Sequence, residues 1–211
     1  MTPTTFERLD WPVTTDRLAI RPCTTRDLRA LFEIRSHPEV AEWMPSQPDD
    51  YEEFVMRHGR SGGHERCLVM ECDGTVVGDL YLHVEDGWAQ AEVKEAAHGS
   101  QAEIGWCLSP DHQGKGYVTE ATTELVRICF EDLGVRRLVA NAFADNAPSL
   151  RVMERLGMVC EGRFRAESLH RDHGWIDGTT YALLRDDWTG QSPDVPVPGW
   201  ASGGNGNVGG P

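Results

Sequence analysis

The sequence predicts a domain of the α/β (α+β) class, in which helices cover a sheet. Stretches with the alternating pattern of strands are interspersed with stretches that have the period of amphipathic helices. Residues 118–133 carry the clearest helical pattern, and the dipeptide Asp73-Gly74 separates two strand-like runs. With 211 residues, the chain is long enough to bury a substantial core in one domain.

The first part of the chain predicts one strand and two helices. Residues 18–22 alternate between apolar and polar side chains, which is typical of a strand. Residues 24–35 place their apolar side chains on one helical face, and Thr24 and Asp27 resemble a capping box. Residues 51–58 show a weaker pattern for a second helix.

A β-hairpin is predicted next, from residues 67–72 and 75–84, because Asp73-Gly74 favours a tight two-residue turn. The polar segment 86–101 follows and is longer than a hairpin turn needs. It either covers a site or forms a surface loop.

The second half predicts further strands and helices. Residues 103–108 and 137–143 read as strands, on either side of the helix predicted over 118–133. Gly134 is expected to end that helix, because glycine readily takes the left-handed conformation found after helix C-termini.

The last predicted elements are a short helix and two long strands. Residues 146–156 have Pro148 in the first turn and Gly157 just after the end, the usual asymmetry of a helix. Residues 158–170 and 175–184 predict the two final strands.

Three segments make up the predicted organisation. Residues 1–14 form an N-terminal arm, residues 15–189 the domain, and residues 190–211 a tail rich in glycine and proline. The tail has too little apolar surface to order itself, so we expect it to be disordered.

Composition limits the possible partners. The formal net charge of −14, without any cluster of Lys and Arg, argues against binding to nucleic acid. The acidity suits a cationic substrate such as an amine, or serves solubility alone. The N-terminus lacks a signal-peptide pattern, and no apolar run is long enough for a membrane span, so we expect a cytoplasmic protein.

The cysteines are scattered along the chain and form no CxxC pair. We therefore expect reduced thiols in the core, with no disulfide and no bound metal. They are Cys23, Cys67, Cys72, Cys107, Cys129 and Cys160.

The segment 111–121 predicts an anion site, because Gly114 and Gly116 lie between a strand and an amphipathic helix. A P-loop would need glycine at Ser109 and Ser or Thr at Gly116, and a dinucleotide fingerprint would need glycine at Thr119. A pyrophosphate loop of the acyl-coenzyme A type fits, as does a plain strand–helix turn.

Four motifs occur in order at familiar spacings, and together they resemble the GNAT superfamily of N-acetyltransferases, most closely its RimJ/RimL branch. The resemblance covers residues 15–188. The motifs are Glu103-Ile104-Gly105-Trp106, Gly114-Lys115-Gly116-Tyr117, Asn146 with Ser149 and Leu156-Gly157-Met158, and Trp175-Ile176-Asp177 with Tyr181-Ala182-Leu183-Leu184-Arg185 and Trp188.

The resemblance implies a GNAT fold: a mixed, strongly twisted sheet of about six to seven strands with helices on both faces. The fourth and fifth strands, here 103–108 and 137–143, would splay apart in a V that admits acetyl-CoA. The pantetheine arm would then take up the unpaired backbone groups like an added strand.

The resemblance also implies a donor site. The family's loop usually begins with Gln or Arg where this chain has Asp111, so backbone N–H groups must bind the diphosphate. Lys115 either assists in binding the diphosphate or is a solvated surface lysine. The implied donor-site residues are Trp106, Cys107, Leu108, Gln113, Gly114, Lys115, Gly116, Tyr117, Val118, Thr119, Asn141, Asn146 and Ser149.

Glu167 is the general base implied by the closest family members, and Glu103 is a second candidate. Either side chain could instead be solvated, or paired with Arg163 or Arg165. The tyrosine that many members use as the acid is replaced by Met153.

Ser149 is the alternative acid that the resemblance offers, although it could simply cap the helix. Asn146 is expected to cap the helix and to bond the pantetheine. A backbone N–H near Leu108 would polarise the thioester carbonyl.

The acceptor site is expected in residues 36–50, with 86–101 as a possible addition. The candidate acceptor-binding residues are Trp43, Met44, Asp49 and Asp50. Three functions remain open at this point: acetylation of a protein or peptide N-terminal amine, acetylation of a small amine (an aminoglycoside-like antibiotic, a polyamine or an amino-acid derivative), and non-catalytic acyl-CoA binding. A monomer or a homodimer would be consistent with the family.

Overall fold

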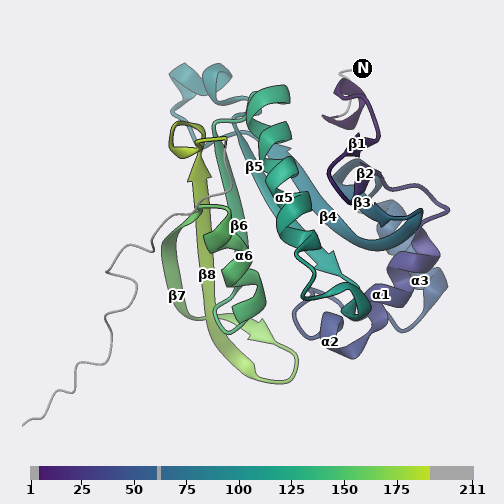
Figure 1. The fold of residues 1–211 in the computed structure, drawn as a ribbon. Helices are drawn as coiled ribbons and strands as arrows, with labels where there is room; N and C mark the ends of the chain where they lie inside the picture. Colours follow the sequence, from purple (N-terminus) through teal and green to yellow (C-terminus); the bar gives the residue numbers. More distant parts are fainter. Residues whose placement is uncertain (1–4, 61–62, 191–211) are drawn as a thin grey trace, which may run out of the picture.

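The computed structural model describes residues 5–60 and 63–190. Within these residues the chain forms one eight-stranded sheet in the order β1-β2-β3-β4-β5-β6-β8-β7, so the predicted six to seven strands are too few (Figure 1). The strands are β1 Val13–Thr14, β2 Ala19–Pro22, β3 Cys67–Cys72, β4 Thr75–Glu85, β5 Gln101–Leu108, β6 Arg137–Phe143, β7 Val159–His170 and β8 Gly174–Leu184.

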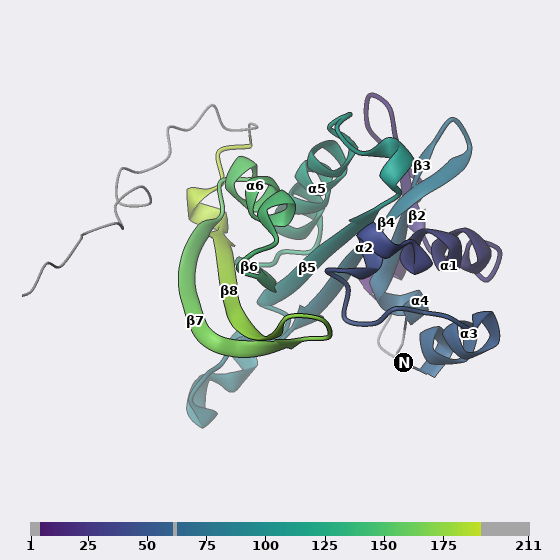
Figure 2. The ribbon, with the colours of Figure 1, turned by 90° about the horizontal axis from the view of Figure 1, so that it is seen from below.

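Helices lie on both faces of the sheet, as predicted. Helix α5 lies against β5 and α6 against β6, while α1 packs against β4 on the opposite side (Figures 1 and 2). The α-helices are α1 Leu28–Ser36, α2 Pro38–Ala41, α3 Tyr51–Arg60, α4 Gly63–Arg66, α5 Tyr117–Arg127 and α6 Ala147–Arg155. The shorter turns are η1 Thr5–Arg8, η2 Ala91–Ala97, η3 Pro110–His112, the π-turn η4 Ile128–Asp132, and η5 Arg185–Asp187.

The sheet opens between β5 and β6, its only parallel pair among the described strands. Their pairing is confined to residues 101–103 of β5 and 137–139 of β6, and beyond it the two strands diverge. Each strand keeps its other neighbour, since β5 stays paired with β4 and β6 with β8. The predicted V-shaped splay is therefore confirmed.

The main core lies between α5 and the sheet. Leu125, Ile128 and Phe130 from α5 and its π-turn are almost fully buried, together with Leu138 of β6. Burying a side chain of this size contributes about 1.5–3 kcal/mol. This packing fixes α5, and with it the loop that precedes α5, against β5.

The β3–β4 hairpin forms as predicted, with Asp73 at φ 51° and Gly74 at φ 76° in its turn. The first helix begins later than predicted, at Leu28. The backbone N–H and hydroxyl of Thr24 donate to the Asp27 carboxylate, which also accepts from Arg21. Asp27 therefore holds a turn before the helix.

Part of the predicted N-terminal arm packs on the domain. Phe6 is buried in the main core, and the Trp11 indole donates to the Phe6 carbonyl at 2.8 Å. Strand β1 then pairs with β2. Residues 1–4 of the arm, and the predicted tail from residue 191 onward, lie outside the described residues.

The segment 86–101 lies at the end of β4 and β5 that is remote from the glycine loop, because it joins Glu85 to Gln101 where β5 begins (Figure 1). In the described part of the chain, no helix has the length and apolar character that crossing a bilayer requires.

Candidate active site

A cleft of about 1740 Å³ occupies the opening of the V. Strand β5 and the loop before α5 form one wall, and β6 with the first turns of α6 forms the other. The β7–β8 hairpin and the chain between α2 and α3 close its far end. The segment 86–101, all of it described, contributes no lining residue, so it does not cover this cleft.

The glycine loop and the start of α5 border the cleft. Gly114 at φ 72° and Gly116 at φ 81° take left-handed conformations that glycine tolerates best. Gly116 is the N-cap of α5 and has no side chain to satisfy the first-turn N–H groups. Those of residues 117–119, which line the cleft, add to the positive end of the helix dipole. The geometry suits an anion.

Arg17 braces this loop, and the sequence reasoning missed it. Its guanidinium donates to the Lys115 carbonyl at 2.8 Å and to the Glu120 carboxylate at 2.7 Å, and it stacks on the Tyr117 ring. Burial raises the pKa of Glu120, but hydrogen bonds from Thr15 and Arg17 outweigh burial and lower it. Nothing in the spacing of residues so far apart in the sequence could indicate this contact.

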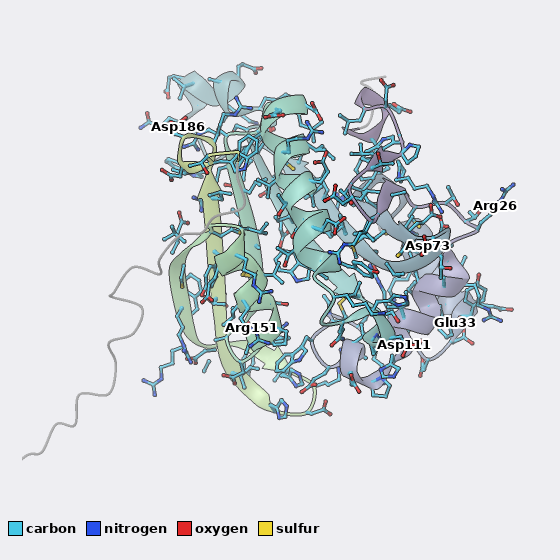
Figure 3. All side chains as sticks on the ribbon, in the orientation of Figure 1. Arg26, Glu33, Asp73, Asp111, Arg151 and Asp186 are labelled. Carbon is cyan, nitrogen blue, oxygen red and sulfur yellow. The ribbon has the colours of Figure 1, made fainter. Side chains whose placement is uncertain are left out.

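Lys115 was expected either to assist diphosphate binding or to be a surface lysine, and both roles stay predictions. Its ammonium donates to the Asp111 carbonyl at 3.0 Å, and the residue does not line the cleft. Asp111 and Arg151 lie at the same end of the molecule, one before α5 and one on α6 (Figure 3). Arg151 does line the cleft, so it supplies a cation that sequence reasoning did not single out.

Glu103 lies at the base of the V, where β5 and β6 still pair. The Asn141 amide donates to the Glu103 carboxylate at 3.0 Å, and Thr180 donates to the Asn141 oxygen at 2.7 Å. A hydrogen-bonded chain therefore spans the base of the cleft from β5 through β6 to β8. The half-buried Glu103 is held in place by this chain.

Glu167 reaches the cleft from a bulge in β7. The register between β7 and β8 shifts between Phe164 and Ser168, and Ala166 takes φ 49°. The Asp177 carboxylate stabilises this bulge by accepting from the Ala166 N–H at 2.9 Å and from Arg163 at 2.9 Å. Arg163 is therefore engaged by Asp177, not by Glu167 as one alternative had it.

Gly178 makes room for the Glu167 side chain. A Cβ at position 178 would lie 2.3 Å from Glu167 Oε2 and 2.8 Å from Ser168 Oγ. The carboxylate thus lies directly over β8, and a side chain at position 178 would have to displace it. Asp177 and Gly178 support Glu167, and the motif Trp175-Ile176-Asp177 was the one sequence signal that pointed to this part of β8.

Asn146 caps α6, and its side-chain oxygen accepts from the Ser149 N–H at 3.2 Å. Ser149 is therefore the capped residue, and its hydroxyl does not serve as the cap. Ser149 lines the cleft beside Met153, which is buried and has no proton to donate.

The tip of the β7–β8 hairpin docks on the chain between α2 and α3 (Figure 2). Arg171 donates to the carbonyls of Ala41 at 2.8 Å and Met44 at 2.7 Å. Buried His170 lies with its ring 5.6 Å from that of Trp43, and its Nε2 is 2.8 Å from the Glu42 carbonyl. These contacts hold the far wall of the cleft together.

Acidic side chains dominate the cleft. Eight carboxylate and four guanidinium residues line it, and one of the arginines, Arg35, is paired with buried Asp79. Asp50 accepts from the Glu53 N–H at 2.7 Å, so its carboxylate also caps α3, while Asp49 is exposed. The excess of negative charge favours a cationic ligand.

Apart from Lys115, the predicted site residues all line this one cleft, although they come from six separate stretches of the chain. They are Trp43, Met44, Asp49, Asp50, Glu103, Trp106, Cys107, Leu108, Gln113, Gly114, Gly116, Tyr117, Val118, Thr119, Asn141, Asn146, Ser149 and Glu167.

Curated relatives match almost the whole domain. The uncharacterized N-acetyltransferase YnaD of Bacillus subtilis (strain 168) is 27% identical over 179 residues, which cover 83% of this chain and 98% of that protein. The putative ribosomal N-acetyltransferase YdaF of the same organism is 29% identical over 188 residues, covering 83% and 96%. Spermidine N(1)-acetyltransferase of Escherichia coli (strain K12) is 27% identical over 153 residues, covering 70% and 76%.

Solved structures share the fold. A GNAT-family acetyltransferase from Bacillus anthracis superposes with a TM-score of 0.69 at 27% identity, covering 82% of this chain and 98% of that one. Mycobacterium smegmatis RimJ in complex with CoA-disulfide superposes with a TM-score of 0.68 at 24% identity, covering 86% and 91%.

A family model described as an acetyltransferase (GNAT) domain matches residues 17–159, which is more than half of the chain. Because these relatives are N-acetyltransferases, the alternative of a non-catalytic acyl-CoA-binding module is set aside. The predicted resemblance is confirmed: this chain belongs to the GNAT family and is an acyl-CoA-dependent N-acetyltransferase.

Proposed function

We propose that this enzyme transfers an acetyl group from acetyl-CoA to the N-terminal amine of a protein or peptide. The observation that carries the proposal is the likeness to YdaF, a putative ribosomal N-acetyltransferase that matches 83% of this chain. The cleft of about 1740 Å³ reaches from the glycine loop to the chain between α2 and α3. The RimJ structure, which holds CoA-disulfide, supports the donor class only.

The loop before α5 fits the diphosphate of acetyl-CoA, which supplies the acetyl group as a thioester. Gly114 and Gly116 are left-handed, and residues 117–119, whose N–H groups begin α5, line the cleft. An anion at a helix N-terminus gains about 0.3–1 kcal/mol, and up to about 2 kcal/mol when it is partly buried. The diverging edges of β5 and β6, with Asn141 and Asn146, would hold the pantetheine arm.

Glu167 is the proposed general base. An amine must lose its proton before it attacks the thioester, and an α-amino group with a pKa near ~7.7–8 does so far more readily than a lysine side chain near ~10.4. The bulge places the Glu167 carboxylate in the cleft, and Asp177 engages the neighbouring Arg163. Glu103, already hydrogen-bonded to Asn141, is the second candidate.

Ser149 is proposed to protonate the leaving thiolate. It lines the cleft at the start of α6, with its N–H already bonded to Asn146, so its hydroxyl is available for this role. A thiol pKa near ~8.5 makes the thiolate a tolerable leaving group, so the contribution of Ser149 is expected to be modest. The N–H of Leu108 would polarise the thioester carbonyl.

The acidic lining supports a second candidate, a small amine such as a polyamine. Carboxylates outnumber guanidinium groups eight to four around the cleft, and the spermidine acetyltransferase relative acts on such a substrate. In both proposals, Trp43 and Met44 form an apolar wall, and Asp49 and Asp50 attract the cationic acceptor.

The experiment is a measurement of CoA release with matched acceptors. We would compare a lysine-free peptide with a free N-terminus, the same peptide with a blocked N-terminus and one lysine, spermidine, and an aminoglycoside. The proposal predicts the highest kcat/KM for the first peptide. A higher value for spermidine or the aminoglycoside would replace it with the small-amine function, and a preference for the blocked peptide would indicate side-chain acetylation.

A further inference from the structure

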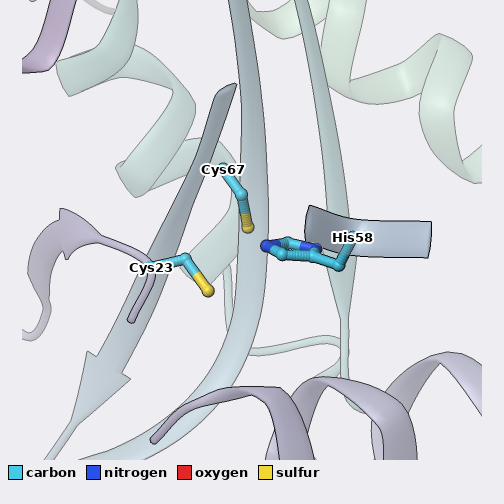
Figure 4. A group of neighbouring side chains, drawn as sticks. All are labelled: Cys23, His58 and Cys67. Carbon is cyan, nitrogen blue, oxygen red and sulfur yellow. The ribbon is translucent and has the colours of Figure 1, made fainter. Parts of the chain in front are cut away.

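Three potential metal ligands meet beside the cleft, although they are scattered in the sequence: Cys23, His58 and Cys67. Cys23 follows β2, Cys67 begins β3, and His58 comes from α3. Their ligand atoms all lie within 4.8 Å of one another, and Figure 4 shows a ring nitrogen of His58 facing the two sulfur atoms. All three residues are buried, with exposed fractions of 4%, 7% and 5%.

The backbone places the two thiols opposite each other. The Cys23 N–H donates to the Cys67 carbonyl at 2.9 Å, which continues the β2–β3 ladder beyond Pro22 and Leu68. Leu28, Leu31 and Phe54 pack around the sulfur atoms in a separate hydrophobic cluster. Two thiols in such a cluster would be ordinary core packing, but an imidazole from a third element completes a set of sulfur and nitrogen donors of the kinds that bind zinc.

We propose that Cys23, His58 and Cys67 bind a zinc ion that fastens α3 to the ends of β2 and β3. Zinc–sulfur distances of about 2.3 Å and zinc–nitrogen distances of about 2.0–2.1 Å place tetrahedral sulfur ligands about 3.8 Å apart. The three atoms need only small side-chain movements to reach that geometry. Two thiolates and a neutral imidazole would neutralise Zn²⁺, so no net charge would be buried.

The local electrostatics agree with this assignment. A hydrogen bond from Cys67, and then the neighbouring His58, lower the pKa of Cys23 to about 5 against the opposing effect of burial. The pKa of Cys67 is raised, first by the proton that it shares with Cys23 and then by burial. Zinc binds thiolates, so metal binding at this pair would release the thiol protons.

The zinc site would fix the position of α3, which lines the part of the cleft where the acceptor is expected. His58 lines the cleft together with Glu53, Phe54 and Arg57 of the same helix. A metal ion bound to His58 would hold α3 against the sheet. Three protein ligands leave a fourth tetrahedral position for a small ligand.

The test is a titration of the reduced full-length protein with Co²⁺ under nitrogen, followed by displacement with Zn²⁺. We expect one equivalent of cobalt to produce sulfur-to-cobalt charge-transfer bands and the intense visible bands of a tetrahedral site. One equivalent of zinc should abolish both sets of bands. At free zinc roughly 100 times Kd, Tm should rise by about 5–10 °C.

The variants Cys23→Ser and His58→Gln test the ligands, and Cys160→Ser, a half-buried thiol on β7, is the matched control. Each ligand variant should weaken zinc binding by at least about 100-fold, because mutating residues that only hydrogen-bond to metal ligands already weakens binding by about 10–100-fold. The control variant should bind zinc as the wild type does. Because any variant could fold poorly, the wild-type spectrum decides: absence of the cobalt bands in the reduced protein would overturn the proposal.

Discussion

At the scale of single residues, the placement of Glu167 depends on two neighbours in β8. Asp177 holds the bulge at Ala166, and Gly178 leaves the space that the carboxylate occupies. Both act on the geometry of the proposed base and not on the acceptor itself. They are positioning residues, and their effect should appear in turnover more than in folding.

Gly178→Ala should displace the Glu167 carboxylate, because the new Cβ would lie 2.3 Å from Oε2. We expect kcat to fall by roughly 10–10²-fold, the scale of an ångström-sized misplacement, with the circular dichroism spectrum unchanged. The double variant Gly178→Ala/Glu167→Gln should be no slower than Glu167→Gln alone. Additive losses would show that Gly178 acts by another route.

Asp27 stabilises the turn before α1 in a manner that depends on pH. Hydrogen bonds from Arg21, and then from Thr24, lower its pKa from 3.8 to about 2 despite burial. Because the folded-state pKa lies below the unfolded one, the stabilisation of about 2 kcal/mol is complete above about pH 4 and is lost as the pH falls toward 2.

Urea unfolding of the wild type and of Asp27→Asn between pH 7 and pH 3 measures the contribution of the Asp27 carboxylate to the free energy of unfolding. The difference in unfolding free energy should be about 2 kcal/mol at pH 7 and should shrink as the pH approaches 3. A difference that stays constant with pH would mean that the carboxylate charge does not stabilise the turn.

At the scale of elements, the glycine loop is held by a segment far away in the sequence. The N-terminal segment supplies Thr15 and Arg17, which bond Glu120 of α5 and the Lys115 carbonyl. The segment before β2 thus supports the proposed donor site, although it contributes nothing to the cleft lining.

Arg17→Ala should loosen the loop and raise the KM for acetyl-CoA by about 5- to 10-fold with little change in kcat. The estimate takes the free energy of one charge-assisted hydrogen bond. It reduces that free energy for solvent screening, because the Arg17 side chain is 47% exposed. Steady-state kinetics with Arg29→Ala, an exposed ion-paired arginine on α1, provides the control. If the two substitutions change the KM for acetyl-CoA equally, Arg17 has no specific role in donor binding.

Elements with strong local signals were predictable from the sequence. The Asp73-Gly74 hairpin, the β6 strand and the α5 helix followed from turn chemistry and periodicity, because those properties are local. The start of α1 was predicted too early, since Asp27 bonds Arg21 and Thr24 before the helix begins.

Tertiary contacts limited the prediction elsewhere. The short β1 pairs with β2 over two residues only, and the bulge that turns Glu167 depends on Asp177 of another strand. The meeting of Cys23, His58 and Cys67 has no signature in sequence spacing. The site residues came instead from the family resemblance.

At the scale of the whole molecule, the cleft lies between two parts of one sheet. Strands β1 to β5 carry the glycine loop, while β6 to β8 carry Asn141, Glu167 and the hairpin tip. The base of the V and the docking of Arg171 on residues 41–44 connect the parts at opposite ends of the cleft. The proposed donor and acceptor sites both draw residues from the two parts, so the thioester and the amine would meet between them.

The most direct measurement is the turnover of Glu167→Gln with the preferred amine, together with its affinity for acetyl-CoA. The account predicts a fall in kcat of about 10²–10⁴-fold with unchanged acetyl-CoA binding, while Glu92→Gln, in the remote η2, keeps the wild-type rate. An unchanged kcat in Glu167→Gln would contradict the account. If Glu103→Gln instead showed the fall in kcat expected for Glu167→Gln, the base would be Glu103 on β5.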